Sequence, residues 1–110
     1  MLKSSNDMNE QQVALAAFEG EIDFTAREDF RAKLAVLAPA EGAIVDLSAV
    51  SYMDSSALAE LLLLQRGRNQ AGRPKMSVVV NPRIRRLFEV AGLQNVLVLT
   101  ATLDEAMALQ

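Results

Sequence analysis

Four short apolar runs, separated by segments whose apolar residues recur at helical spacing, constrain the fold of this chain most strongly. They are VALAAF at 13–18, AIVDL at 43–47, MSVVV at 76–80 and VLVL at 96–99. Short runs of this kind, with β-branched residues, are typical of strands buried in a sheet. Strands that alternate with helices through short connections predict an α/β fold, with right-handed crossovers wherever the strands are parallel.

Turn and capping residues indicate where these elements begin and end. Gly20 is expected to end the first strand, and TARE at 25–28 has the pattern of a capping box for a helix over 26–37. NPRIRRLFEVAG at 81–92 has Asn, Pro and Gly where a helix begins and ends. TLDE at 102–105 predicts a last capped helix.

Length and composition indicate one domain over residues 1–110, in which 51% hydrophobic residues suffice for a core. The net charge of −3 favours neither direct nucleic-acid binding nor attraction to a membrane surface. Residues 1–11 are polar and lack the apolar segment of a signal peptide, so we expect a flexible or edge-strand N-terminus and a cytoplasmic protein. The longest apolar run, LLLL at 61–64, is too short for membrane insertion.

The chain contains no cysteine and no histidine, and this excludes several classes of chemistry. Disulfides, thiolate nucleophiles and cysteine zinc sites need cysteine. The Ser-His-Asp triad and the commonest transition-metal sites need histidine. Ser56 also lacks the G-x-S-x-G elbow of serine hydrolases. We therefore expect no catalytic residue, no metal site and no enzyme activity.

Three small polar residues stand where the second strand is expected to pass into a leucine-rich helix, in SYMDSSALAELLLL at 51–64. Asp54 is a natural N-cap, with Ser55 and Ser56 in the first helical turn. Capping alone would explain these residues, and a leucine run is more often core than binding surface, so both explanations stay open.

A helical projection suggests which serine a partner protein can reach. With Leu58 taken as the inward position, Ser55 leans toward the strand ends, and Ser56 points the opposite way, beside Glu60 and Leu63. An exposed leucine next to a reachable hydroxyl group indicates a surface for protein docking. Ser56 is therefore the predicted site of contact or modification.

Phosphorylation fits the position of Ser56 better than catalysis does. A phosphoryl group there would lie at a helix N-terminus, where free amide groups and the helix dipole favour negative charge. The helix should therefore remain folded. The added charge, next to Asp54 and Glu60, would repel a protein docked over that surface, which suits reversible control.

Three stretches carry a resemblance to a known family: FEGEID at 18–23, VDLSAVSYMDSSALAELL at 45–62 and NPRIRRLFEVAGLQNVL at 81–97. In this order and spacing they resemble the STAS family and, within it, the bacterial anti-sigma factor antagonists. The resemblance implies a mixed central sheet of four or five strands with about four helices, mostly on one side of the sheet.

The resemblance also implies a mechanism. Such an antagonist, when unphosphorylated, binds an anti-sigma factor that is a serine kinase with its own bound ATP, and this frees the sigma factor. The kinase then phosphorylates the second serine of D-S-S, here Ser56, and a phosphatase resets the cycle. The antagonist is expected to need no cofactor and to be a monomer or weak dimer. The residues expected to contact the partner are Asp23, Asp54, Ser55, Ser56, Ala57, Glu60 and Leu63.

One residue departs from the family pattern, and two other functions stay open. The family often has glycine where this chain has Ala57, so a methyl group is expected on the approach path to Ser56. STAS domains also serve as small subunits of ABC-type lipid transport systems, in which Ser56 would lie in a docking site without phosphorylation. Arg83, Arg85 and Arg86 would suit a nucleic-acid patch, but the overall acidity favours a solvated helix face, with nearby carboxylates as pairing partners.

Overall fold

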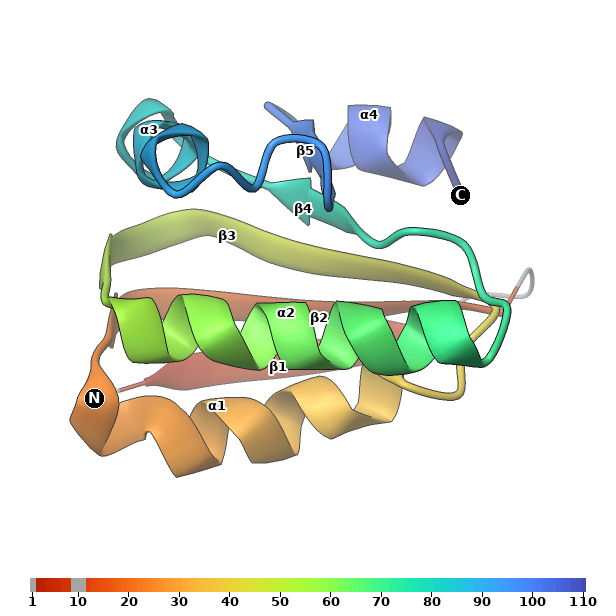
Figure 1. The fold of residues 1–110 in the computed structure, drawn as a ribbon, viewed down its shortest axis with the longest axis horizontal. Coiled ribbons are helices and arrows are strands. Elements are labelled where there is room, and N and C mark those ends of the chain that lie inside the picture. The colour runs from red at the N-terminus through yellow and green to blue at the C-terminus, as the bar shows by residue number, and fades with distance from the viewer. Residues whose placement is uncertain (1, 9–11) are drawn as a thin grey trace.

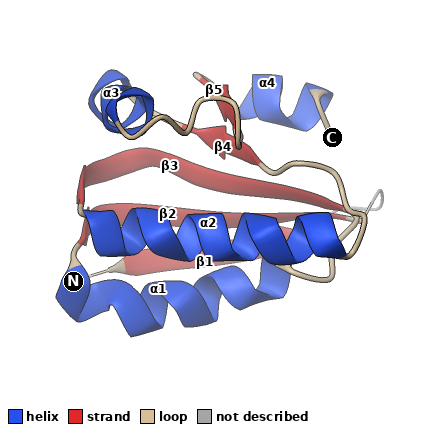
Figure 2. Cartoon of the chain, viewed as in Figure 1, coloured by secondary structure: helices blue, strands red, loops and turns tan. Residues whose placement is uncertain are grey.

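A computed structural model describes residues 2–8 and 12–110, and in this part of the chain the fold is α/β. Figure 1 shows the arrangement, and Figure 2 distinguishes helices from strands. The strands are β1 (Lys3–Met8), β2 (Val13–Ile22), β3 (Gly42–Met53), β4 (Ser77–Val79) and β5 (Val98–Thr100). The helices are α1 (Arg27–Leu34), α2 (Ser55–Gln70), α3 (Pro82–Val90) and α4 (Leu103–Ala108), with 3-10 turns at Phe24–Ala26 and Ala35–Leu37.

The strands form one mixed sheet in the order in which they occur along the chain. β1 lies at one edge and pairs antiparallel with β2, while the pairs β2–β3, β3–β4 and β4–β5 are parallel. The predicted mixed α/β sheet is confirmed. For the N-terminus, β1 agrees with the edge-strand alternative, and residues 1 and 9–11 lie outside the described residues.

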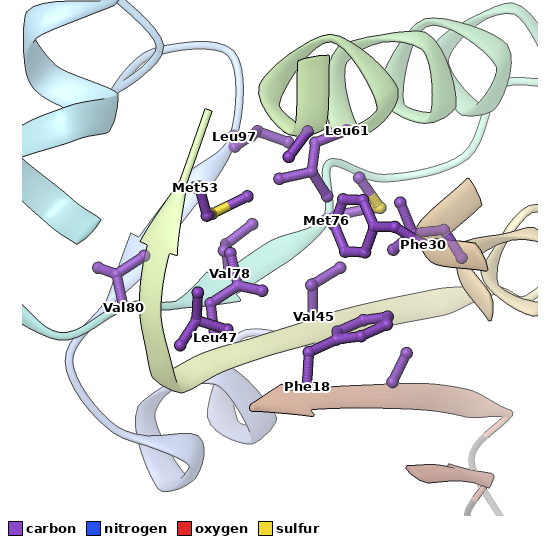
Figure 3. Close-up of a cluster of buried hydrophobic side chains, with 14 of the residues drawn as sticks. Phe18, Phe30, Val45, Leu47, Met53, Leu61, Met76, Val78, Val80 and Leu97 are labelled. Carbon is purple, nitrogen blue, oxygen red and sulfur yellow. The ribbon is translucent and has the colours of Figure 1, made fainter. Parts of the chain in front are cut away.

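The main core lies between the sheet and the helices that cover one face, where α1 and α2 run side by side (Figure 1). Figure 3 shows Val45, Leu47 and Val78 directed from the strands into this core. Phe18 and Phe30 meet there edge to face, with ring centres 4.8 Å apart. A second cluster on the alternate strand positions lies under α4 and consists of Val13, Ile44, Val79 and Ala106.

Two strands are longer than the sequence predicts. β2 continues through Gly20, which has a φ of +90°, and its pairing with β3 shifts register next to that residue. Glycine adopts this backbone conformation at low cost, so the strand bends there and continues. The pairing reaches Ile22 and Met53, and these two strands therefore end side by side.

The caps predicted for α3 and α4 are confirmed, and the cap predicted for α1 is wrong. Asn81 accepts a hydrogen bond from the Ile84 amide at 2.9 Å, and Thr102 accepts one from the Glu105 amide at 3.1 Å. The capping box expected at 25–28 is absent, because Asp23 caps the 3-10 turn that precedes α1.

The C-terminal end of α2 is anchored by a buried cation. Arg68 is 1% exposed, and its guanidinium group donates to the carbonyls of Leu37, Ala40, Glu41 and Pro74 over 2.7–3.2 Å. These carbonyls belong to the segments before β3 and before β4. One side chain thus fixes the helix end against two loops.

Candidate functional site at the carboxyl ends of β2 and β3

The predicted site lies where β2 and β3 end beside each other and pass into α1 and α2 (Figure 2). The amide of Asp54 donates to the carbonyl of Ile22 at 3.2 Å, which joins the two strand ends. Asp23 and Asp54 directly follow the paired residues Ile22 and Met53. The structure therefore brings together the two acidic residues that the sequence placed in separate motifs.

Asp54 organises the start of α2. Its Oδ1 accepts hydrogen bonds from the amide of Ser56 at 3.0 Å, from the amide of Ala57 at 3.1 Å and from the Ser56 hydroxyl group at 2.5 Å. One carboxylate oxygen therefore satisfies two free amide groups of the helix and also orients the serine hydroxyl. The prediction of Asp54 as N-cap is confirmed.

The neighbouring strand end has the same geometry. Asp23 Oδ1 accepts from the amide of Thr25 at 3.0 Å, from the amide of Ala26 at 3.3 Å and from the Thr25 hydroxyl group at 2.5 Å. The two loops differ in the element that each one caps, because Asp23 begins a three-residue 3-10 turn, whereas Asp54 begins the 16-residue α2.

The predicted directions of the two serines are wrong. Ser55 is exposed, and Ser56 is half-buried on the side of α2 that faces α1. The projection used Leu58 as the inward position, but the buried face of the helix is centred nearer Ala57 and Leu61. Ser56 is nevertheless only half-buried, so the residue keeps some accessible surface.

Two residues expected to contact a partner offer it almost no surface. Ala57 is 0% exposed, so its methyl group points into the core, and the prediction that it narrows the approach to Ser56 is wrong. Glu60 is 5% exposed because α1 covers it, and its carboxylate accepts two hydrogen bonds of 2.8 Å from Arg31. The sequence reasoning missed Arg31, which lies 29 residues away along the chain.

Local hydrogen bonds keep the acidic residues of this corner ionised. Burial acts to raise the pKa of Asp54, but hydrogen bonds from Ser56, Ala57 and the Phe24 backbone outweigh it and hold that pKa below its ordinary 3.8. The hydrogen bonds from Arg31 lower the pKa of Glu60 below its ordinary 4.5. The Thr25 hydroxyl group lowers the pKa of Asp23.

Large apolar side chains are exposed around the corner. Leu63 is 56% exposed, as predicted, and Phe24 before α1 and Val90 on α3 are 67% and 80% exposed. A hollow of about 420 Å³ lies between the start of α2 and α3, lined in part by Ser55 and Val90. Exposed apolar residues around polar groups are typical of protein-binding surfaces. Phe24 is not among the contact residues that the sequence predicted. Its position directly after Asp23, the acidic residue of the first motif, was the sequence signal that could have identified it.

The arginines of α3 lie near the same hollow, which Arg83 and Arg86 help to line. Arg83 and Arg85 reach the carbonyls of Ser51 and Leu99 at 3.5 Å. Within residues 2–8 and 12–110 none of the three α3 arginines forms an ion pair, so the expected pairing with carboxylates is wrong.

Neither a cluster of metal-binding side chains nor a membrane-spanning helix occurs in the described part of the chain. The described residues contain no group of three or more acidic side chains arranged to hold a metal ion. None of the helices in the described ranges is both long and apolar enough to cross a bilayer.

Known proteins share both sequence features and the fold of this chain. The family model described as "Mlab, STAS domain" matches residues 4–100. An anti-sigma factor antagonist from Mycobacterium paratuberculosis superposes with a TM-score of 0.85 at 23% identity, over 99% of this chain and 93% of that chain.

A second similar protein, SpoIIAA, is represented by two states. The anti-sigma factor antagonist SpoIIAA in its unphosphorylated form superposes with a TM-score of 0.73 at 22% identity, over 96% of both chains. The phosphorylated form, described as a Bacillus cell-fate determinant, superposes with a TM-score of 0.69 at 23% identity, over 96% of this chain and 97% of that chain. At these identities the superpositions establish a shared fold.

Proposed function

Because the chain belongs to the STAS family, we propose that it is an anti-sigma factor antagonist that phosphorylation of Ser56 switches off. The observation that carries the proposal is the half-buried Ser56, whose hydroxyl group Asp54 holds at the N-terminus of α2. The unphosphorylated protein binds an anti-sigma factor that is a serine kinase and so releases the sigma factor. Both proteins act in the cytoplasm, and a phosphatase restores the unphosphorylated form.

The hydrogen bond to Asp54 prepares the serine for phosphoryl transfer. The hydroxyl proton points to Asp54 Oδ1, which leaves the lone pairs of Ser56 Oγ free for an incoming phosphorus atom. The kinase supplies ATP. The Oγ–P bond forms as the bond between the γ-phosphorus and the ADP oxygen breaks, and the hydroxyl proton passes to a base or to water in the kinase site.

After transfer the fold remains and the surface changes. The phosphate carries about −1.5 to −2 charges at neutral pH and lies at the N-terminus of α2, where the helix dipole favours an anion. A kinase docked on Asp23, Asp54, Ser55 and Leu63 then faces added negative charge. Repulsion and desolvation release the partner.

Intact mass measurement tests the modification. The candidate anti-sigma kinase and ATP should add one phosphate to the wild type and none to Ser56→Ala. Ser55→Ala, which removes the more exposed hydroxyl group, should be labelled like the wild type. Labelling that persists in Ser56→Ala and disappears in Ser55→Ala would assign the switch to Ser55 instead.

Binding measurements test the consequence of the modification. Ser56→Asp places a carboxylate at the same position and should bind the kinase at least about tenfold more weakly, because it adds like charge next to Asp54. Its circular dichroism spectrum should match that of the wild type. Tight binding by folded Ser56→Asp would contradict release by repulsion.

A second candidate function is that of a small subunit in an ABC-type lipid transport system. The name Mlab in the matching family description favours it. In this case the corner docks on a transporter ATPase or permease, and Ser56→Ala should bind as the wild type does. Genes for a transporter beside that for this protein, and binding to that ATPase without ATP-dependent labelling, would select this candidate.

A further inference from the structure

Ser56 stands between two carboxylates on the side of α2 that faces α1. Asp54 accepts a hydrogen bond from its hydroxyl group, and Glu60 is four residues further along the same helix face. Glu60 pairs with Arg31 of α1, which establishes the direction of that face. A phosphate on Ser56, the modification proposed above, would therefore form between two negative groups and would need a nearby cation.

Arg31 is not free to serve as that cation. Its Nε and Nη2 donate to the two carboxylate oxygens of Glu60, each at 2.8 Å. Glu60 is 5% exposed, so the departure of Arg31 would leave a buried carboxylate without its partner. The Arg31 side chain is itself 55% exposed, but its two parallel charge-assisted hydrogen bonds are the strong form of this contact, and Arg31 is therefore held in place.

Arg27 is placed to serve instead. It lies in the first turn of α1, and its guanidinium carbon is 5.4 Å from the centre of the Phe24 ring. Its charge also lowers the pKa of Glu60, so it lies within electrostatic reach of that carboxylate. In the part of the chain that the structure describes, its side chain has no hydrogen-bonded carboxylate. Its contact with an exposed aromatic ring is weak enough to exchange.

We propose that Arg27 is the receptor for phosphate on Ser56, and that phosphorylation moves its guanidinium group from the Phe24 ring to the phosphate. Two neighbouring features place the guanidinium group of Arg27 near Ser56. α1 and α2 begin at the same edge of the sheet and run side by side (Figure 1). The Phe24 backbone also reaches Asp54, and Arg27 lies over the ring of that same Phe24 while its charge acts on Glu60, so Arg27 is near the segment that contains Ser56. A charge-assisted pair with phosphate is stronger than the cation–π contact that it replaces.

The exchange would change the docking surface beyond the phosphate itself. Phe24 is already 67% exposed, and when the guanidinium group leaves, the ring loses its cation–π contact. A partner that recognises the stacked pair therefore meets a different surface after phosphorylation. Repulsion by charge and loss of a defined contact would act together.

A titration of the phosphoprotein tests the proposal. Phosphoserine is incorporated at position 56 of the full chain by an expanded genetic code, and ³¹P NMR follows its second pKa, which is about 6 in an exposed peptide. Arg27→Gln should raise that pKa by about 0.5 or more relative to the wild type. Arg27→Lys should restore most of the difference. Lys33→Gln removes one positive charge farther along α1 and should leave the pKa near the wild-type value.

The titration reports on Arg27 among other charged groups. Residues 23–34 and 54–60 surround Ser56, and their charged members are Asp23, Arg27, Glu28, Asp29, Arg31, Lys33, Asp54 and Glu60. Phe24 ring resonances should shift on phosphorylation in the wild type and stay unchanged in Arg27→Gln. Equal phosphoserine pKa values in Arg27→Gln and Lys33→Gln would overturn the proposal.

The inference about Arg27 rests on the proposed phosphorylation of Ser56, but the experiments distinguish failure of the inference from failure of the proposed function. Because phosphoserine is incorporated during translation, the titration needs no kinase. If the kinase labels the wild type and the titration shows no effect of Arg27, the proposed function stands and the receptor is wrong. If the titration shows the effect and no kinase labels Ser56, the receptor geometry holds and the proposed function fails.

Discussion

The two ends of α2 use polar side chains in opposite ways. At the N-terminal end Asp54 bonds only to groups two and three residues along the chain, apart from its contact with the Phe24 backbone. At the C-terminal end Arg68 bonds to carbonyls up to 31 residues away, and water is excluded from it. The first set of bonds is local and partly exposed, and the second is long-range and buried.

This difference indicates how α2 could be modified at one end and still remain packed against the rest of the fold. The buried cation fixes the C-terminal end of α2 against the loops before β3 and β4. The N-terminal end then needs only its cap, and a change of charge on Ser56 leaves the distant contacts untouched. The contacts that anchor α2 thus lie at the opposite end of its 16 residues from Ser56, the proposed site of modification.

The largest expected effect concerns the anchored end. Arg68→Met keeps much of the side-chain volume but leaves four carbonyls without this donor, two of them in buried hydrogen bonds, and we expect the free energy of unfolding to fall by about 3 kcal/mol. Urea denaturation followed by circular dichroism measures it. Arg66→Met, an exposed position on the same helix, should change stability by less than about 0.5 kcal/mol. Equal effects at the two arginines would remove the distinction between the ends.

The next effect concerns the cap. Asp54→Ala should lower the free energy of unfolding by about 1–2 kcal/mol, because the first amides of α2 lose their acceptor. Asp54→Asn, which retains a capping oxygen, should cost less. Asp23→Ala should also cost less, since Asp23 begins only a three-residue turn. Urea midpoints of the three variants rank their losses of stability. A larger loss for Asp23→Ala than for Asp54→Ala would show that the loop at Asp23 supports the loop at Asp54.

The two ends should also differ in their response to pH. Asp54 and Glu60 have folded-state pKa values below their ordinary 3.8 and 4.5, so the unfolded chain binds protons more readily. Their contribution is complete above the ordinary values and is lost as pH falls through the folded ones. Urea midpoints measured down to pH 2.5 should therefore decrease, and less steeply in Asp54→Asn. Arg68→Met should run parallel to the wild type, because arginine does not titrate there.

The sequence predicted most of the fold because its signals are local. Alternating apolar runs and helical spacing identified the elements, and the caps at Asp54, Asn81 and Thr102 need only residues within three positions. The prediction that the strand ends at Gly20 was wrong. Pairing with β3 continues past this glycine to Ile22, through a bend that the apolar pattern does not reveal. The repeated spacing of Asp23 to Thr25 and Asp54 to Ser56 was a usable signal for the true first cap.

The candidate site was predicted less completely, for a physical reason. Which face of α2 is covered depends on α1, and the Arg31–Glu60 pair joins residues 29 positions apart. A charged residue is normally assigned to solvent, so neither buried Glu60 nor buried Arg68 could be inferred from one helix alone. The position of Ser56 between Asp54 and α1 is a consequence of these long-range contacts.

The smallest expected effect is the removal of the Ser56 hydroxyl group. Ser56→Ala loses one hydrogen bond to Asp54 but keeps both backbone amides on the same carboxylate, so the free energy of unfolding should fall by less than about 1 kcal/mol. Ser55→Ala, at an exposed position, should change it by less than about 0.5 kcal/mol. Urea denaturation of both variants beside Arg68→Met makes the comparison direct. If Ser56→Ala were as destabilising as Arg68→Met, the N-terminal end would be an anchor too, and a phosphate there would unfold the helix rather than switch its surface.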